Sequence, residues 1–430
     1  MTLFADRFRR HKFILSLVCL FLIFAGHNLG FLAGFAGDEL RYRSAAWEIF
    51  SGGPQMNLEH PLLSKTLQGV FAGLTAMLGF DPIVGMRVPS LLAGAGALAA
   101  TYAIALRFLS ARAAVLAALL LFSNTLLWVH ARMISPEMVS LGFLLAALYF
   151  FLADRISGDR AAIGLAGAAL GLSLSAKWIG VWLVPWALAR LAVSRAWKKS
   201  ARFLAGMIVF YVIGNGAYFL NHAPLDLFQW QWWALHYHQT SEALSPHNGS
   251  PAWTWFAVPQ HLYYARLMPD PQAAEVVMGA MNLLVFALAG PAIWIGARSG
   301  PAGRLILEAA LCLYVPWMFV ARPTYFFYVL TVLPLVCLLE AVCLDRLWDK
   351  YRRAAGALPA CALVLFMFFY PAAVGMRIGV KYERCLAALN FYKRPVFDSM
   401  FCQKCNLFFE RGVEISGDYS LPLPPKGGED

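Results

Sequence analysis

Repeated runs of nearly uninterrupted apolar residues constrain this chain more than any other feature of its sequence. A helix needs about 20 mostly apolar residues to cross roughly 30 Å of hydrocarbon. Of the 430 residues, 60% are hydrophobic and 14% are charged. We therefore predict an all-α polytopic membrane protein with about eleven transmembrane helices. The predicted spans are residues 13–34, 88–108, 112–129, 138–154, 161–176, 178–194, 203–220, 276–297, 304–320, 323–344 and 356–376.

The positive charge of the chain is concentrated in short loops between these spans. In a soluble protein a net charge of +11 would suggest a nucleic-acid partner. Here more than half of the 35 Lys and Arg residues fall in loops on the side that holds the N-terminus. The positive-inside rule accounts for that pattern, so we predict membrane lipids as surroundings and no nucleic-acid partner. The first span follows RFRRHK with no small-residue cleavage site after it, and we interpret it as retained.

This orientation divides the chain into four predicted parts. Residues 1–220 form an N-terminal transmembrane catalytic module that includes a first outer loop, 35–87. Residues 221–275 form an outer loop rich in aromatic residues and His, 276–376 the C-terminal transmembrane helices, and 377–430 an outer tail. We predict amphipathic helices in the first outer loop, because its apolar stretch GVFAGLTAMLGF is too short to cross a bilayer.

Asp38 and Glu39 lie directly after the first span, at the outer membrane edge. Ionisable groups at such positions are functional candidates, and a carboxylate has a short stem that cannot reach far toward water. The alternative is that Asp38 caps a helix that begins at Leu40.

Further charged groups are predicted on the same outer side. They are Glu59, His60 and Lys65 in NLEHPLLSK, Arg132 and Glu137 in HARMISPEM, Lys177 in SAKWIG, and Arg322 in VARPTYFFY. Arg binds phosphate with a planar fork and Lys with a point charge, while a partly buried carboxylate can act as general base. The set suggests a transfer in which a phosphate leaves and a hydroxyl attacks. The alternative for Arg and Lys at span ends is that they only extend toward headgroups.

The outer loop 225–266 is dense in Trp, His and Tyr. Aromatic faces stack on sugar rings and contact lipid headgroups, so the loop fits a sugar substrate. The alternative is that the loop simply lies on the bilayer. A metal site based on HYH (236–238) lacks a partner set. FCQKC, with Cys402 and Cys405, is a single pair, which favours a local disulfide or no function over zinc.

These motifs, in this order, resemble those of the dolichyl-phosphate-mannose protein mannosyltransferase family. The resemblance rests on the acidic pair after the first span and on HPLLSK, ARMISPE, LSAKWIG, HNGSPAWTW, HLYY and ARPTYFFYVLTVLPL. It covers most of residues 1–345. The wider clan of membrane glycosyltransferases also includes the aminoarabinose transferases of lipid A. Leu62 stands where that family usually has a second proline, and Glu137 where an Asp is more usual.

The resemblance implies a GT-C type scaffold and an inverting glycosyltransferase that uses a polyprenyl-phosphate sugar donor. It makes Asp38 the base and Glu39 a group that orients or binds the acceptor. Arg132, Lys177 and Arg322 would bind the donor phosphate. The donor and acceptor pocket would comprise Glu59, His60, Lys65, Glu137, His247, Ser250, Trp253 and Tyr263.

The expected reaction moves a mannose-like sugar to an acceptor hydroxyl on the periplasmic or lumenal face. We expect the acceptor to be a protein Ser or Thr. Lipid A, another glycolipid or a polysaccharide is the alternative, and a transporter of lipid-linked sugars is an alternative of a different class. Transporters commonly show repeated halves, which this chain lacks. No cofactor is firmly predicted, and a divalent metal is left open.

We expect an integral protein of the bacterial inner membrane with a periplasmic active site; the endoplasmic reticulum membrane is the alternative. The Gly- and Ala-rich runs 91–103 and 164–176 admit two interpretations. They would line a groove for the polyprenyl tail, or they would allow close helix–helix packing.

Overall fold

The computed structural model describes residues 2–30, 36–53, 55–159, 161–240, 249–320 and 323–392. His247, Arg322, Cys402 and Cys405 lie outside these ranges, so the predictions for them stay predictions. The helices are α1 (Thr2–Gly26), α2 (Glu39–Ser51), α3 (Leu63–Met77), α4 (Pro82–Phe108), α5 (Ala111–Phe122), α6 (Thr125–Ala131), α7 (Pro136–Ser157), α8 (Ala162–Ala176), α9 (Leu183–Val193), α10 (Trp197–Gly214), α11 (Asp226–Thr240), α12 (Leu283–Gly296), α13 (Gly300–Tyr314), α14 (Leu333–Ala373) and α15 (Val380–Ala388). Short 3₁₀ turns are η1 (Trp178–Gly180), η2 (Gly216–Leu220), η4 (Ala252–Thr254), η5 (Val315–Phe319) and η6 (Phe326–Thr331), and the strands are β1 (His261–Asp270), β2 (Ala273–Ala280) and β3 (Arg377–Gly379).

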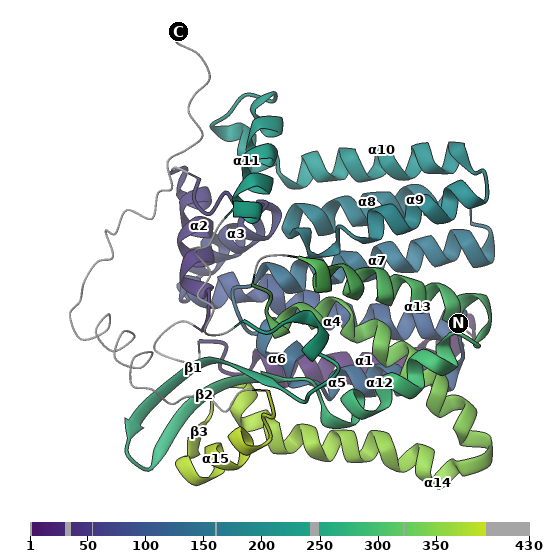
Figure 1. Cartoon of the computed structure of the whole chain (residues 1–430). Helices are drawn as coiled ribbons and strands as arrows, with labels where there is room; N and C mark the ends of the chain where they lie inside the picture. The colour runs from purple at the N-terminus through teal and green to yellow at the C-terminus, as the bar shows by residue number, and fades with distance from the viewer. Residues whose placement is uncertain are drawn as a thin grey trace.

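The long helices run side by side, and the shorter elements gather at one end of them. In Figure 1, α7, α8, α10, α13 and α14 share one direction, while α2, α3, α11 and the strands lie at the left end of the bundle. The segments that carry the predicted outer motifs therefore meet at one end.

The prediction of a membrane-spanning helical protein is confirmed, whereas the count of eleven spans stays a prediction. Within the described residues, four helical segments are long and apolar enough to cross a membrane: α4, α7, Gly300–Phe319 and α14. α5 and α6 together pass the same test as a pair bent by 67°. Shorter apolar helices, His11–Gly26, Ala162–Ala176, Trp178–Val193 and Leu283–Gly296, fall in other predicted spans.

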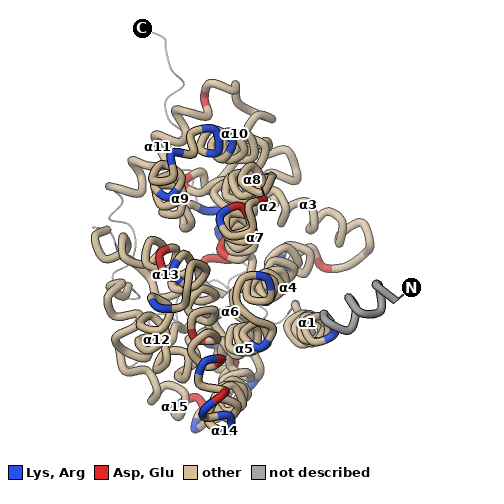
Figure 2. Tube along the Cα trace, turned by 90° about the vertical axis from the view of Figure 1, so that its right-hand side faces the viewer, with Lys and Arg blue, Asp and Glu red and all other residues tan. Residues whose placement is uncertain are grey.

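Basic residues mark the opposite end of the bundle from α2 and α3. Arg107 lies in the last turn of α4 and Arg155 in the last turn of α7, while Arg112 and Lys198 lie at the starts of α5 and α10. Figure 2 looks onto this end and shows the blue segments where these helices end or begin. The positive-inside rule associates such an end with the inner side, and the orientation in the membrane stays a prediction.

Two predicted spans, 323–344 and 356–376, are joined differently from expectation. α14 begins at Leu333 and continues for 41 residues, with non-helical backbone angles at Tyr351. A straight helix of that length would be about 60 Å long, twice what one crossing needs. The break at Tyr351 replaces the inner loop that we predicted between the two spans.

The chain is not entirely helical, which corrects the all-α prediction. β1, β2 and β3 form an antiparallel sheet in that order, with β1 and β2 joined as a hairpin. We predicted a loop up to residue 275 and a span from 276, but β2 occupies Ala273–Ala280 and α12 begins only at Leu283. The aromatic and β-branched residues of these segments favour strands, and Asn282 caps α12 by accepting a hydrogen bond from the Leu284 amide.

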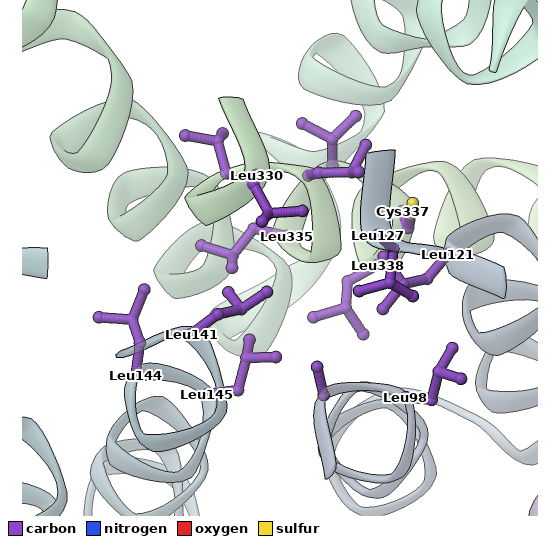
Figure 3. Packing of buried hydrophobic residues seen from close by; sticks show 14 of the residues in the cluster. Leu98, Leu121, Leu127, Leu141, Leu144, Leu145, Leu330, Leu335, Cys337 and Leu338 are labelled. Carbon is purple, nitrogen blue, oxygen red and sulfur yellow. The ribbon is translucent and has the colours of Figure 1, made fainter. Parts of the chain in front are cut away.

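One large apolar core joins the helices. Figure 3 shows Leu98, Leu127, Leu141, Leu145 and Leu338 in this core, contributed by α4, α6, α7 and α14. α6 is buried along its whole length. Its first residue, Thr125, donates to the Ala280 carbonyl and accepts from the Ala280 amide, which attaches α6 to the end of β2.

α8 and α10 contact each other backbone to backbone. A Cβ on Gly167 would lie 2.0 Å from the Phe203 carbonyl oxygen, and one on Gly171 would lie 2.3 Å from the Met207 carbonyl oxygen. Small residues allow this approach between membrane helices. The run 164–176 therefore serves helix–helix packing.

Helices α2 and α3 are present in the predicted first outer loop. Both contribute buried residues to the protein, while Met77 at the end of α3 is 83% exposed. Their placement at a membrane surface stays a prediction, as does the division of the chain into four parts.

Candidate active site

Asp38 is exposed at the position before the first residue of α2. It occupies the N-cap position, yet its side chain makes no capping hydrogen bond. The alternative interpretation of Asp38 as a helix cap therefore lacks its defining contact. Gly37, directly before it, has φ +57°, a left-handed conformation that favours glycine.

Glu39, in contrast, is fully buried, and both of its carboxylate oxygens accept hydrogen bonds from other parts of the fold. Its carboxylate accepts from Arg87 Nε and Nη2, both at 2.9 Å, from Ala36 N at 2.8 Å and from Ile134 N at 2.7 Å. Arg87 also donates to the Leu29 carbonyl at 2.7 Å. The pair joins α2, α4 and the segment after α6, so Glu39 holds the backbone next to Asp38 in place.

Sequence reasoning did not single out Arg87. The only signal was an Arg one residue before a predicted span, a position where Arg usually extends to headgroups. Arg87 is 1% exposed and faces inward.

Lys177 and Glu137 form a buried ion pair, although they come from different helices. Lys177 Nζ donates to Glu137 Oε1, and the two side chains are 7% and 6% exposed. Lys177 follows the last residue of α8 in extended conformation, which interrupts the apolar helix and turns the side chain toward α7. Its Nζ also lies 5.6 Å from the ring centre of Phe327 in η6. The structure thus brings three of the predicted motifs together.

Glu137 is linked onward to β1 by Ser135 and His130. Ser135 Oγ donates to Glu137 Oε2 at 2.6 Å and lies 3.2 Å from His130 Nδ1. His130 Nε2 lies 2.7 Å from the Tyr264 hydroxyl oxygen.

Arg132 is buried elsewhere and contacts main-chain oxygens. Its Nη groups donate to the carbonyls of Ala25, His27 and Asn28 at the end of α1, and to that of Val374 at the end of α14. Helix C-termini carry unsatisfied carbonyl groups and a partial negative charge, which a guanidinium complements. In this structure Arg132 therefore ties two helix ends together.

The NLEHPLLSK motif forms a folded turn against α11. Lys65 Nζ donates to the carbonyls of Asn57 at 2.6 Å and His60 at 2.8 Å, and it is 1% exposed. Burial lowers the pKa of Lys65 to about 7, while the charge of Glu59 acts in the opposite direction. The His60 ring lies 5.3 Å from that of His238 in α11, and His238 Nε2 contacts the Glu59 carbonyl at 2.7 Å.

The charges of Asp38 and Glu137 both affect two buried tyrosines. Burial raises the pKa of Tyr42 well above 10, and the negative charges of Glu137, Asp38 and Glu59 raise it further. Burial likewise raises the pKa of Tyr264, with added contributions from Glu137 and Asp38. Tyr264 also accepts a hydrogen bond from the Gly37 amide at 2.8 Å and contacts His130, so it connects the segment of Asp38 with the Lys177–Glu137 pair.

The predicted acceptor-side residues are only partly near this site. Ser250 exchanges main-chain and side-chain hydrogen bonds with Thr324, both at 2.8 Å, and so joins the outer loop to the segment before η6. Trp253 is 61% exposed. Tyr263 packs against the cluster around β2 and α15, whereas the next residue, Tyr264, contacts His130. Sequence reasoning chose Tyr263, but Tyr264, at an irregularity of the strand pairing between Tyr263 and Ala265, faces the site.

Among the residues that the structure describes, no group of three or more His, Cys, Asp and Glu is arranged to hold a metal ion.

Part of the chain matches a known protein family. A family model described as dolichyl-phosphate-mannose-protein mannosyltransferase matches residues 59–218, fewer than half of the chain. The match includes Arg132, Glu137 and Lys177 and begins after Asp38 and Glu39. None of the curated protein sequences compared with the chain matches it.

Several solved structures share the fold. The protein O-mannosyltransferase Pmt1–Pmt2 complex of S. cerevisiae, bound to the sugar donor, aligns with a TM-score of 0.72 and 12% identity over 85% of this chain and 90% of that one. ArnT from Cupriavidus metallidurans, bound to undecaprenyl phosphate, aligns with 0.58 and 20% identity over 90% and 67%. The Archaeoglobus fulgidus oligosaccharyltransferase aligns with 0.55 and 13% identity over 99% and 62%.

These findings confirm the resemblance to the dolichyl-phosphate-mannose protein mannosyltransferases and show the fold of the GT-C membrane glycosyltransferases. They also support an integral membrane protein.

Proposed function

We propose that the chain is an inverting glycosyltransferase that moves a sugar from a polyprenyl-phosphate carrier to an acceptor hydroxyl on the outer face of the membrane. The observation that carries the proposal is the connection through Tyr264 between the segment of an exposed carboxylate, Asp38, and the buried Lys177–Glu137 pair. The family match and the neighbours bound to undecaprenyl phosphate or to a sugar donor support it.

Asp38 is the proposed base. It takes the proton of the acceptor hydroxyl as that oxygen bonds to the anomeric carbon, on the side opposite the phosphate. The bond from the anomeric carbon to the phosphate oxygen breaks, and its electron pair leaves with the phosphate. General base catalysis of this kind contributes about 10²–10⁴-fold. An exposed side chain with no capping bond is suited to meet an incoming acceptor.

Lys177 is the proposed ligand of the departing phosphate. Its charge lies beside the ring of Phe327 and is held by Glu137, in surroundings that exclude water. A cation in such a place stabilises the charge that develops on the leaving group, an effect of about 3–4 kcal/mol for one well-placed group. Arg322, which the resemblance also assigns to the phosphate, remains part of the proposal.

The proposed sugar is mannose-like and the proposed acceptor a protein Ser or Thr. A protein O-mannosyltransferase among the structural neighbours supports both. Transfer to lipid A or another glycolipid is the alternative. The exposed Trp253 offers a ring face for stacking on the acceptor side. We place the enzyme in a bacterial inner membrane with the site on the periplasmic face.

The test is Asp38→Asn in purified protein supplied with a panel of undecaprenyl-phosphate sugars. We expect transfer to fall at least 100-fold, with undecaprenyl phosphate binding retained. Asp81→Asn is the matched control, because Asp81 is another exposed carboxylate at a helix N-cap and Asn preserves its cap. Full transfer by Asp38→Asn would remove Asp38 as the base.

A second variant tests the phosphate ligand. Lys177→Met should weaken undecaprenyl phosphate binding about 10-fold or more. Lys199→Met is the control, since Lys199 forms a similar pair with the buried Asp154. Equal affinities in the two variants would contradict the assignment.

A further inference from the structure

Tyr264 and Lys177 lie at the two ends of one chain of buried hydrogen bonds. Tyr264 contacts His130 at 2.7 Å, and His130 contacts Ser135 at 3.2 Å. Ser135 donates to Glu137 at 2.6 Å, and Glu137 accepts from Lys177. Each of these residues is less than a tenth exposed, so water does not compete for the bonds.

Glu137 determines the direction of every bond in this chain. An ionised carboxylate only accepts, so the single hydroxyl proton of Ser135 goes to Glu137. His130 Nδ1 must then donate to Ser135 Oγ. His130 is 3% exposed, and burial disfavours the charged form of an imidazole. A neutral imidazole with its proton on Nδ1 accepts at Nε2, so the Tyr264 hydroxyl is the donor to it.

Tyr264 also contacts the segment that carries Asp38. Its carbonyl oxygen accepts from the Gly37 amide at 2.8 Å. Its ring is so close to Gly37 that a Cβ there would lie 3.3 Å from the Tyr264 Cδ1 atom. Tyr264 thus contacts the segment of Asp38 through its main chain. Through its hydroxyl and His130 it is linked to the Glu137–Lys177 ion pair.

We propose that Tyr264 and His130 are positioning residues that set the placement of Asp38 relative to the Glu137–Lys177 pair. The proposal rests on the proposed function, because the role of these hydrogen bonds would be to align Asp38, the proposed base, with Lys177, the proposed phosphate ligand. Small misplacements of reacting groups lower rates strongly.

The test uses the full-length protein with Tyr264→Phe, His130→Asn and the double variant. Phe keeps the ring and the main-chain contact with Gly37, and Asn keeps an N–H donor near Ser135. The undecaprenyl-phosphate sugar that the wild type transfers serves for kcat, and undecaprenyl phosphate serves for Kd. Tyr382→Phe is the control, because it removes a hydrogen bond from a tyrosine hydroxyl to the Phe368 carbonyl. Both residues are far from Asp38 in sequence and take no part in the hydrogen bonds between Tyr264 and Lys177.

We expect each single variant to lower kcat about 10-fold, with the Kd for undecaprenyl phosphate changed less than 2-fold. Since both variants break the same bond, the double variant should be no slower than the slower single variant. The control should match the wild type. A parallel loss of affinity and kcat, multiplicative losses in the double variant, or an unchanged kcat would each overturn the positioning role. A wild type that neither binds undecaprenyl phosphate nor transfers sugar would overturn the proposed function itself.

Discussion

Glu39 and Arg87 meet through two parallel hydrogen bonds of 2.9 Å, with both side chains at most 1% exposed. Two-pronged pairs of this kind fix orientation as well as distance. Because the pair lies one residue from Asp38, the acidic dipeptide that stands out in the sequence divides into one exposed group and one buried group.

Glu39→Gln should therefore act on stability first. Removing one partner leaves the Arg87 charge buried without its counter-charge, at a cost of about 3–5 kcal/mol. Thermal unfolding in detergent measures the loss. Glu48→Gln, on the same helix α2 but only partly buried, should change the melting temperature little. Equal melting temperatures for the two variants would show that the ion pair does not hold the fold.

Arg132→Lys separates a structural role from phosphate binding. A single ammonium cannot reach the carbonyls of both Ala25 and Val374. We expect stability to fall by about 2–4 kcal/mol, while the Kd for undecaprenyl phosphate changes less than 2-fold. A selective loss of affinity at unchanged stability would instead support the phosphate role that the family resemblance implies for Arg132.

Gly37→Ala tests how tightly the base segment is held. Alanine at φ +57° costs about 1–2 kcal/mol, and its Cβ would also press on Tyr264 and Met133. Gly79→Ala is a matched control, because Gly79 has φ +77° and open space around its Cβ position. Both variants should lose similar stability, but only Gly37→Ala should lower the rate of sugar transfer. Equal rates in both would mean that the Tyr264 contact does not place Asp38.

Lys65 predicts a particular dependence of stability on pH. Burial lowers its pKa from 10.5 to about 7, so between these values the folded state binds fewer protons than the unfolded state. Stability should then rise with pH across this window, by at most about 1.4 kcal/mol per pH unit, and Lys65 should add no slope below it. Melting temperatures from pH 6 to 10 measure the slope.

Lys65→Met should flatten that rise. Lys381→Met, at an exposed lysine of α15, should leave it unchanged. A slope that survives in Lys65→Met would assign the pH dependence to other groups.

Hydropathy predicted the helical membrane scaffold, and the motifs singled out Lys177 and Glu137, although not their pairing. Apolar length directly reports what can cross a bilayer, and the motifs are local in sequence. The sequence did not predict contacts between distant residues, since nothing near Glu39 indicates Arg87, 48 residues away, as its partner. The hairpin was missed because its aromatic residues also fit an interfacial loop.

The choice of Tyr263 over Tyr264 was made for a predicted loop. Only the strand, with its irregular pairing between Tyr263 and Ala265, shows which of the two side chains faces the site. Arg132 illustrates a different limit. A guanidinium suits phosphate and helix C-termini equally well, and only the fold shows which of them it meets.

The contact between α8 and α10 restricts how a long isoprenoid chain can approach the site. Carbonyl oxygens of α10 lie directly against Gly167 and Gly171 of α8. A lipid tail therefore does not fit between these two helices. We therefore expect the polyprenyl carrier of the proposed reaction to enter and leave along another side of the bundle.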